Sequence, residues 1–273
     1  MPDAKLDIET GTSDLLASRI GRVLVLTLNR PQVRNALSPE MLDALALQLE
    51  GGAVDEKVGC VVLTGATGAF CSGGDVGAMS ATSATIGADE IAQQQRIQRQ
   101  TAGKLSNFEK PTIAAINGPA AGAGLALALA CDLRMMSSIT FVTTAFGKVA
   151  LPGDFGGAYL ATKILGTACA RELYLLSERI GATEALRIGL ANRVYSPEEL
   201  FGETMKLAER LGNGPALALK HMKQSLNRAL VADMEECMDS DAANHIHCLD
   251  SADFQEASSA FLENRQPSFH NPS

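Results

Sequence analysis

Residues 113–124 read IAAINGPAAGAG, and this stretch decides how the chain folds. The apolar run Ile113–Ile116 predicts a short buried strand, which Asn117–Pro119 ends because proline cannot continue a central strand. The small residues that follow lead into a helix rich in Ala and Leu that runs through Ala130. A strand that passes through a glycine-rich loop into a helix is typical of α/β proteins, and it predicts that class here.

The sequence upstream repeats this pattern. The Val- and Leu-rich run Arg22–Leu28 predicts a strand, and Ser38, followed by proline, predicts the start of a helix with apolar residues at helical spacing. A second buried strand is expected at Cys60–Leu63, and it leads into the glycine-dense loop Gly65–Gly77. Residues 80–87 are small and polar and predict a further loop.

Helical patterns dominate the second half of the chain. A long amphipathic helix is expected over Asp89–Phe108, and from Tyr159 onward nearly all of the chain is predicted to be helical, with Ser196 as a clear start signal. No linker composition separates two folding units. We therefore predict one mixed α/β core over residues 1–195 and a helical C-terminal subdomain over residues 196–273.

The composition argues against several kinds of partner. The net charge of −8 and the absence of Trp predict no nucleic-acid partner and no anionic membrane surface. The longest apolar stretch, Ala120–Cys131, is too short to span a bilayer, and the acidic N-terminus is unlike a signal peptide, so a cytoplasmic protein is predicted. The cysteines lack metal-site spacing, and His245 and His247 would diverge on a helix, so no metal is predicted.

Two glycine-containing loops can direct backbone N–H groups at a ligand. They are Phe70–Asp75 and Asn117–Gly124, and the second runs into a helix N-terminus with unpaired N–H groups. Two such groups that converge on one oxygen form an oxyanion hole. Tight helix packing explains the same small residues, and both interpretations are open from the residues alone. The dinucleotide-binding fingerprint and the P-loop motif are both absent from the sequence.

Asp154 is the acid whose surroundings differ most from those of a surface carboxylate. It lies in the apolar, glycine-rich stretch Pro152–Gly157, with Lys148 as the nearest cation in the sequence. Desolvation there is expected to raise its pKa, which suits a proton shuttle at neutral pH. The alternative is that Asp154 caps the helix expected near Gly156, since Asp is a favoured N-cap. Solvated or structural positions are expected for the other acids of this region, Asp75, Asp89, Glu90, Glu109 and Asp132.

Six segments occur in the order and at the spacing of a known superfamily. They are Leu28–Pro31 with Asn35–Leu37, Phe70–Asp75, Ile116–Gly124 with Cys131 and Asp132, Gly153–Gly157, Ala185–Val194, and Ala260–Arg265. Over about residues 15 to 267 the chain resembles the crotonase (enoyl-CoA hydratase/isomerase) superfamily. The resemblance implies a spiral of ββα repeats with a C-terminal helical trimerisation subdomain, a homotrimer or dimer of trimers, and an acyl-CoA thioester substrate. Coenzyme A would be part of that substrate, and no separate cofactor is expected.

The matching positions imply roles for individual residues. They put the oxyanion-hole N–H groups on Gly74 and Ala123 and the catalytic carboxylate on Asp154. Arg34 and Arg265 match positions near the coenzyme A phosphates or adenine, although each would also be unexceptional as a solvated cation. The substrate-binding residues implied by the resemblance are Arg34, Ala36, Ser72, Gly73, Asp75, Val76, Gly122 and Arg265.

The chain departs from the hydratases of this superfamily at both of their catalytic glutamates. The first would fall at Ala126 and the second near Ala145–Gly147, where no acid occurs. A single aspartate at Asp154 instead resembles the enoyl-CoA isomerases and ring-opened phenylacetyl-CoA isomerases, and it predicts migration of a double bond. The alternatives are a hydratase that adds water to a 2-enoyl-CoA and a CoA-binding member without turnover. The absence of Trp disfavours an aryl-CoA dehalogenase, which would need an aromatic cage.

Overall fold

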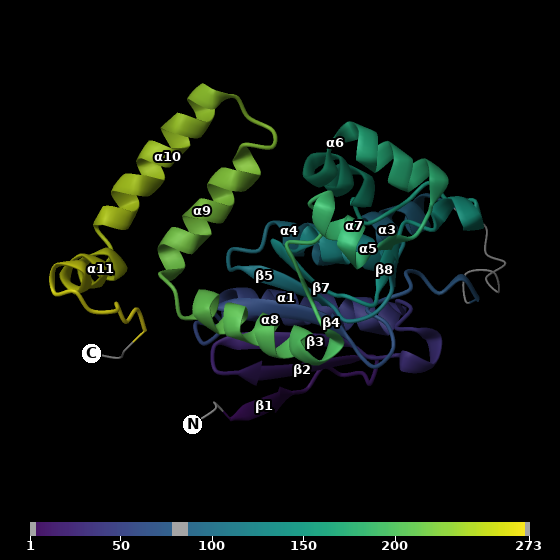
Figure 1. Ribbon diagram of the computed structural model, residues 1–273, viewed down its shortest axis with the longest axis horizontal. Helices are drawn as coiled ribbons and strands as arrows, with labels where there is room; N and C mark the ends of the chain where they lie inside the picture. Colours follow the sequence, from purple (N-terminus) through teal and green to yellow (C-terminus); the bar gives the residue numbers. More distant parts are fainter. Residues whose placement is uncertain (1–3, 78–86, 271–273) are drawn as a thin grey trace.

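The computed structural model describes residues 4–77 and 87–270. Within them, a main sheet has the strand order β1-β2-β3-β4-β5-β7-β10 and a smaller sheet has the order β6-β8-β9. Helices pack on both faces of the main sheet (Figure 1), so the predicted mixed α/β class is confirmed. The loop predicted over residues 80–87 lies, apart from Gly87, outside the described residues.

Aliphatic runs build the centre of the main sheet. The strands predicted at Arg22–Leu28, Cys60–Leu63 and Ile113–Ile116 are confirmed with small differences at their ends. Strands β1, β2 and β3 pair antiparallel, whereas the neighbours from β3 to β10 pair parallel. The strands are β1 (Lys5–Ile8), β2 (Leu15–Ile20), β3 (Val23–Leu28), β4 (Cys60–Gly65), β5 (Thr112–Ile116), β7 (Leu133–Ser137) and β10 (Arg193–Tyr195).

The remaining strands are not predicted by the sequence pattern because they are short or partly polar. The small sheet contains β6 (Ala120–Ala121), β8 (Phe141–Thr143) and β9 (Ile180–Gly181). Together with β10, the strand β9 corrects the expectation that nearly everything after Tyr159 is helical. The parallel pairing of β6 with β8 fixes the segment that leads into the helix after Gly122.

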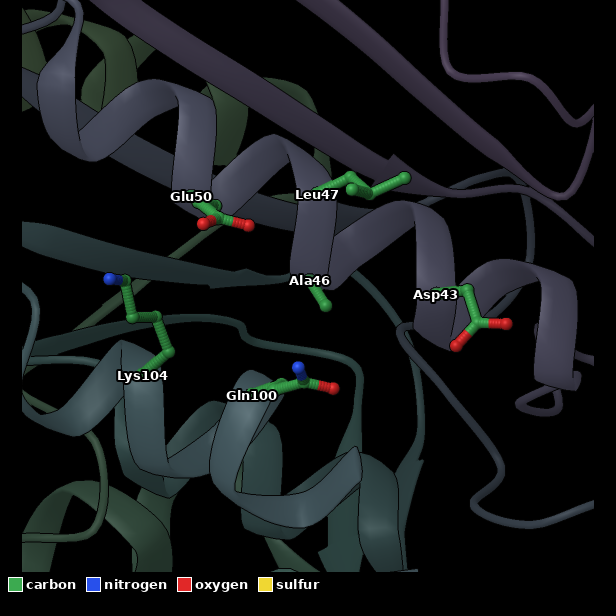
Figure 2. A pocket seen from close by; sticks show the side chains of 6 residues that line it. All are labelled: Asp43, Ala46, Leu47, Glu50, Gln100 and Lys104. Atoms are coloured by element: carbon green, nitrogen blue, oxygen red, sulfur yellow. The ribbon is translucent and has the colours of Figure 1, made fainter. Parts of the chain in front are cut away.

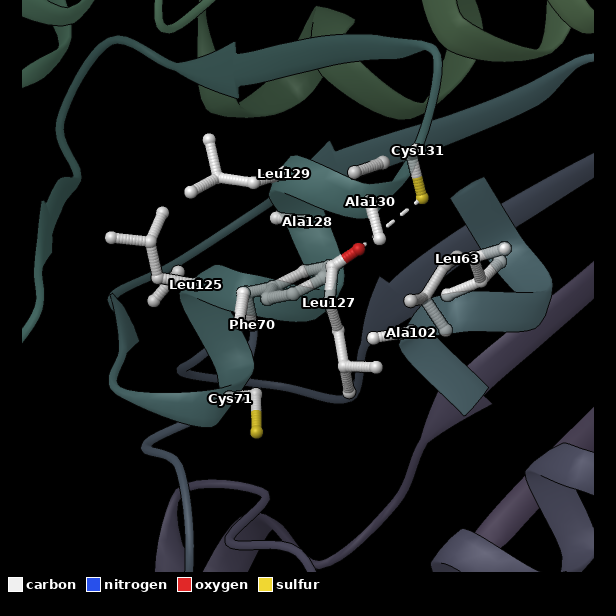
Figure 3. Packing of buried hydrophobic residues seen from close by; sticks show 14 of the residues in the cluster. Leu63, Phe70, Cys71, Ala102, Leu125, Leu127, Ala128, Leu129, Ala130 and Cys131 are labelled. Atoms are coloured by element: carbon white, nitrogen blue, oxygen red, sulfur yellow. Dashed lines mark hydrogen bonds between the residues drawn. The ribbon is translucent and has the colours of Figure 1, made fainter. Parts of the chain in front are cut away.

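Alternate residues of the central strands face two separate cores, as the two-residue period of a strand requires. On β3, the three leucines lie in the core that includes α1 (Pro39–Val54) and α5 (Ala123–Ala130). The two valines lie in the core formed with α8 (Pro197–Gly212). Figure 3 shows the first core around α5, whose eight residues are all buried. A helix buried all round holds its N-terminus at a fixed place in the fold.

Two of the longer helical stretches depart from simple helices. The helix expected over Asp89–Phe108 is divided into α3 (Ala88–Gln98), a π-helical turn η2 (Arg99–Gly103) and α4 (Lys104–Ser106). Helix α6 (Gly157–Leu176) is interrupted at Gly166, where φ is 76°. This interruption turns the second half of α6 away from the axis of the first, so its last residues can return towards its start.

The C-terminal helices divide into one that covers the sheet and three that extend from it. Helix α8 begins as predicted after Ser196, whose hydroxyl accepts a hydrogen bond from the Glu199 N–H at 3.3 Å. The final three helices extend to one side of the molecule (Figure 1), and the first of them stays joined to the main body by the ion pair of Lys223 with Asp132 at 2.8 Å. Helix α8 packs on β3, β4 and β5 and so belongs to the same core as the main sheet. The predicted division into a core over residues 1–195 and a subdomain over residues 196–273 therefore stays a prediction. The remaining helices are α7 (Ala182–Arg187), α9 (Ala216–Arg228), α10 (Met234–Leu249) and α11 (Ala252–Leu262).

Membrane insertion has no candidate element in the part of the chain that the structure describes. Over residues 4–77 and 87–270, every helix is too short or too polar to cross a bilayer.

Candidate active site

The two glycine-containing loops lie against each other at the start of α5. The N–H groups of Phe70 and Cys71 donate to the Pro119 carbonyl at 3.1 and 3.2 Å, and the Ala121 N–H donates to the Cys71 carbonyl at 2.8 Å. A further bond from the Leu37 N–H to the Gly73 carbonyl, at 2.8 Å, holds the far end of the first loop. The structure therefore brings together two segments about 50 residues apart, as the parallel sheet requires of loops that follow neighbouring strands.

Glycine is required where these loops touch. A Cβ on Gly124 would lie 2.6 Å from both the Cβ and the carbonyl oxygen of Cys71. Gly73 has φ +92°, and a Cβ there would lie 3.0 Å from the Ala121 carbonyl and 3.4 Å from the Ala123 nitrogen. Both clashes are with backbone or a fixed side chain, so neither site tolerates a larger residue. Tight packing thus explains Gly73 and Gly124, and it also sets the loop beside the helix N-terminus.

Two backbone N–H groups at this junction are left without a partner. Among residues 4–77 and 87–270, neither the Gly74 N–H nor the Ala123 N–H donates a hydrogen bond, and the first bond into α5 runs from Ala126 to the Gly122 carbonyl at 3.1 Å. Free N–H groups at a helix N-terminus favour a negative charge. The arrangement can therefore stabilise an oxyanion, which is the role expected of Gly74 and Ala123.

Asp154 sits in a tight turn just before α6. The side chain is half-buried, and its Oδ1 atom is buried with no hydrogen-bond partner in the described residues. Loss of hydration raises the pKa of this carboxyl from 3.8 to about 6. The alternative role as a helix cap is wrong, because Gly156 occupies the N-cap position and no side chain caps α6. Asp154 contributes only its backbone carbonyl, which accepts from the Gly157 N–H at 3.0 Å.

Aromatic and small side chains surround the turn that carries Asp154. The Tyr174 and Phe146 rings stack with centroids 6.0 Å apart, and both rings border Gly153. The Tyr174 hydroxyl lies against Gly157, where a Cβ would also be 3.1 Å from the Cβ of Ala126. Burial and the nearby Asp154 charge together raise the pKa of Tyr174 to about 12, so its hydroxyl stays protonated. Ala126, matched to the first hydratase glutamate, and Phe146, within the Ala145–Gly147 stretch near which the second is expected, therefore border the same small region as Asp154.

Several of the other acids of this region have partners in the structure. The Asp75 carboxylate pairs with the Arg30 guanidinium at 3.2 Å, and Asp132 accepts from Lys223 Nζ at 2.8 Å. Glu90 accepts from the Gly87 N–H at 2.8 Å, which places it in the first turn of α3. Asp154 differs from these acids because its buried Oδ1 atom has no hydrogen-bond partner among the residues described.

Most of the predicted substrate-binding residues share one edge of the fold. The Ser72 N–H donates to the Arg34 carbonyl at 3.0 Å, and the Ser72 hydroxyl donates to the Val33 carbonyl at 3.2 Å. This pairing joins the turn containing η1 (Pro31–Val33) to the proposed oxyanion loop. The residues brought together here are Arg34, Ala36, Ser72, Gly73, Gly74, Asp75, Val76, Gly122 and Ala123.

Arg265 is not brought to this edge within one chain. It follows α11, at the opposite side of the molecule from α5 and α6 (Figure 1). Its guanidinium pairs with Glu256 and Glu263, each at 2.6 Å. The role of Arg265 in coenzyme A binding therefore requires a second copy of the chain and stays a prediction.

Two grooves of the described surface differ in their relation to this site. A groove of about 390 Å³ is lined by Gln98, Phe155 and Tyr159, next to the turn of Asp154. A separate groove of about 480 Å³ lies between α1 and the η2–α4 segment, and none of the predicted site residues lines it. Figure 2 shows that its side chains are mostly polar, with Lys104 and Gln100 opposite Glu50 and Asp43.

Potential metal ligands do not cluster in the described residues. Across residues 4–77 and 87–270, no group of three or more His, Cys, Asp or Glu side chains is placed to hold an ion. His247 instead pairs with His221, across α9 and α10, with ring nitrogens 3.1 Å apart, while His245 is exposed nearby.

The sequence did not predict that Gln98, Phe146 and Tyr174 lie around the turn of Asp154. The side-chain amide oxygen of Gln98, Oε1, accepts a hydrogen bond from the Phe155 N–H at 3.1 Å. Tyr174 reaches Gly157 only because α6 is interrupted at Gly166, since an unbroken helix would separate the two by roughly 25 Å. The glycine inside a helical pattern was the available signal for that interruption.

Comparison with known proteins identifies the class. The sequence matches the enoyl-CoA hydratase/isomerase family over residues 19–272. It is 32% identical to the short-chain-enoyl-CoA hydratase of Clostridium acetobutylicum, over 93% of this chain and 96% of that protein. It is 33% identical to the 1,2-epoxyphenylacetyl-CoA isomerase of Escherichia coli K12, over 90% and 94% of the two chains. The crystal structure of an enoyl-CoA hydratase from Polaromonas sp. JS666 superposes with a TM-score of 0.88 at 30% identity, over 94% and 99%.

The chain belongs to the enoyl-CoA hydratase/isomerase family, and it has the crotonase-like α/β fold that its motifs implied. It is therefore an enzyme of a family whose members act on acyl-CoA thioesters. Most of the similar proteins bear the name hydratase, and one of those compared is an isomerase. These names support the family and give no preference for the isomerase.

Proposed function

We propose that this enzyme moves a double bond in an enoyl-CoA, with Asp154 as the single proton shuttle. The observation that carries the proposal is one half-buried carboxylate whose pKa is raised by burial and whose Oδ1 atom has no hydrogen-bond partner among the residues that the structure describes. A base whose pKa lies near neutrality can take up a proton and return it in the same turnover.

The proposed reaction needs only one carboxylate. Asp154 removes a proton from the α carbon of a 3-enoyl-CoA, and the electron pair of that C–H bond moves onto the thioester oxygen to form a dienolate conjugated with the double bond between the β and γ carbons. The N–H groups of Gly74 and Ala123 stabilise the negative charge on this oxygen. The protonated Asp154 then returns the proton to the γ carbon, which moves the double bond to between the α and β carbons and gives the 2-enoyl-CoA. No atom is gained or lost.

Hydration would require more from this site than one carboxylate can supply. Water must be deprotonated as it attacks the β carbon while the α carbon receives a proton, and the hydratases of the family use two glutamates for this. By the resemblance, the first would fall at Ala126 and the second near Ala145–Gly147, and neither place holds an acid. The hydroxyl of Tyr174, with its pKa raised to about 12, is a poor base at neutral pH. These side chains favour isomerisation over the hydratase activity for which most relatives are named.

The same proposal includes the coenzyme A part of the substrate and the oligomer. Coenzyme A enters as part of the thioester, so no separate cofactor is proposed, and Arg34 is exposed beside the oxyanion loop where it can meet a phosphate. The projecting helices and the turn between α9 and α10 carry large exposed apolar side chains, including Val231, Met234 and Phe261. Such a surface supports a homotrimer or dimer of trimers. In that assembly the Arg265 of a neighbouring copy can approach the coenzyme A.

The test compares Asp154→Asn with a matched acid-to-amide control. Asp89→Asn is the control because Asp89 is exposed in the first turn of α3. We expect Asp154→Asn to lower kcat for conversion of 3-enoyl-CoA to 2-enoyl-CoA by about 10³-fold, since the proton shuttle is lost. Asp89→Asn should keep the wild-type rate. An Asp154→Asn variant that is folded and as active as wild type would refute the proposal.

A further inference from the structure

The turn that carries Asp154 has an unfavourable backbone conformation. Gly153 and Gly156 have positive φ angles of 114° and 69°, and between them Phe155 has φ 49° although it has a side chain. A left-handed conformation at a bulky residue costs on the order of 1 kcal/mol or more, and it persists only where surrounding contacts enforce it. The direction of the Asp154 side chain depends on this turn, so the contacts that enforce it matter for the reaction.

One side chain from a distant helix supplies such a contact. The Gln98 Oε1 atom accepts the Phe155 N–H at 3.1 Å, and the two residues are 57 positions apart in the sequence. Gln98 is half-buried at the end of α3. The π-helical turn η2 that follows Gln98 is itself fixed, because Thr101 and Ala102 are buried. The Thr101 hydroxyl also donates a hydrogen bond to the Ile97 carbonyl at 2.7 Å. The acceptor is therefore held at a fixed place.

We propose that Gln98 is a positioning residue for the reaction: its amide oxygen holds the Phe155 N–H and so fixes the turn that aims the Asp154 carboxylate. This inference rests on the proposed role of Asp154. Gln98 itself makes no proton transfer. An amide suits this position because it accepts a hydrogen bond without placing a negative charge beside Asp154, where a like charge would raise the carboxyl pKa further.

The experiment removes the acceptor and then restores it. Gln98→Met keeps the length of the side chain and the helix propensity but lacks the amide oxygen. Gln98→Glu restores an oxygen acceptor and adds a charge. Gln95→Met is the matched control, because Gln95 lies one turn earlier on α3, lines the same groove, and makes no side-chain hydrogen bond within residues 4–77 and 87–270.

We expect Gln98→Met to lower kcat about tenfold with KM within about twofold, because the base is misaligned while binding groups are unchanged. Gln98→Glu should recover most of kcat at alkaline pH, and the acid limb of its pH–rate profile should move to higher pH. Gln95→Met should match wild type in every readout. Melting temperatures of all three variants check that the fold is intact.

The outcomes separate this inference from the proposed function. A wild-type kcat in Gln98→Met, with Asp154→Asn inactive, overturns the positioning role and leaves the proposed function standing. The positioning role is also overturned if Gln98→Met lowers kcat while Gln98→Glu neither restores kcat nor shifts the acid limb of the pH–rate profile. A residue that only supports the fold would give that result. Full activity in Asp154→Asn overturns both.

Discussion

The loop that carries Gly74 and the turn that carries Asp154 differ in how the rest of the chain holds them. Backbone hydrogen bonds fix the first loop from several directions, and Gly73 packs tightly against the backbone of Ala121 and Ala123. In the second, Phe155 is left-handed although it has a side chain, and the Asp154 carboxylate oxygen Oδ1 has no partner among the residues described. One region is built for stability, and the other stores strain.

This difference indicates that the two regions have different roles in the proposed site. A backbone oxyanion hole serves any reaction that passes through a thioester enolate, so its geometry has to be rigid and needs no particular side chain. The carboxylate decides where protons go, and the chemistry changes with the acids placed around the enolate. Strained or desolvated groups are retained where they serve such a function at the expense of stability. The predictions below test whether the two regions respond oppositely to mutation.

The largest effect of a glycine substitution is expected where the two loops touch. Gly124→Ala would place a Cβ 2.6 Å from the Cβ and carbonyl of Cys71, so the oxyanion loop must move away from α5. We expect kcat to fall by about 10²-fold or more, as on loss of one oxyanion donor, together with a lower melting temperature. Steady-state kinetics and thermal unfolding measure the two effects.

Gly202→Ala is the control for that substitution. Gly202 is exposed in α8, and a Cβ there meets nothing within 4 Å. The change should leave kcat unaltered and stabilise the fold by about 0.5–1 kcal/mol, as usual for Gly to Ala in a helix. If Gly124→Ala were as stable and active as Gly202→Ala, the rigid packing described for the oxyanion loop would be wrong.

The Asp154 turn should respond in the opposite direction, with lost activity and increased stability. The pKa of Asp154 in the folded chain, about 6, lies above its ordinary value of 3.8, so the ionised form destabilises the fold. This penalty is complete above about pH 6, declines as pH falls through that window, and disappears below 3.8. Allowing for partial solvent screening, Asp154→Asn should be more stable than wild type at pH 8 by about 1 kcal/mol.

Denaturant unfolding at pH 8 and pH 4 measures this difference, which should shrink at the lower pH. In the same pH range, kcat/KM of the wild type should fall about tenfold per unit below about pH 6, as the base becomes protonated. A variant less stable than wild type at pH 8 would show that Asp154 supports the fold and carries no functional strain.

The smallest effect is expected at the acid beside the oxyanion loop. Asp75→Asn keeps an oxygen near Arg30 but removes the charge from a partly exposed ion pair. We expect a loss of about 0.5–1 kcal/mol in stability and kcat within about threefold of wild type. Asp7→Asn, in the exposed pair with Lys5, is the control and should change neither quantity. A loss of kcat as large as that of Asp154→Asn would instead make Asp75 a catalytic residue.

Much of the fold could be predicted because its central strands and helix starts have local signals. The buried strands at Cys60–Gly65 and Thr112–Ile116 are continuous apolar runs, as parallel strands covered on both faces require. Ser38 caps α1 by accepting from the Met41 N–H at 3.2 Å, as its sequence position predicted. The short strands β6 and β9 could not be predicted, since two residues carry no periodicity and their pairing is set by tertiary contacts.

The sequence allowed a site to be proposed where the chemistry depends on the backbone and on a single acid, and not where distant side chains meet; the roles of the proposed residues stay predictions. Gly74, Ala123 and Asp154 follow from motifs and from the composition around them. Gln98 and Tyr174 gave no signal, because one contact depends on the position of a helix end and the other on the interruption within α6. The sequence also left the capping role of Asp154 open, which only the φ angle and position of the N-cap residue could exclude.

The most direct test is the mass of the products formed by the wild-type enzyme from 3-enoyl-CoA and 2-enoyl-CoA, analysed in parallel in ¹⁸O-labelled water. A site with one proton shuttle at Asp154 should interconvert the two isomers with no change in mass and no ¹⁸O in the product. Efficient conversion of 2-enoyl-CoA to a labelled product heavier by one water, and unimpaired in Asp154→Asn, would contradict the account.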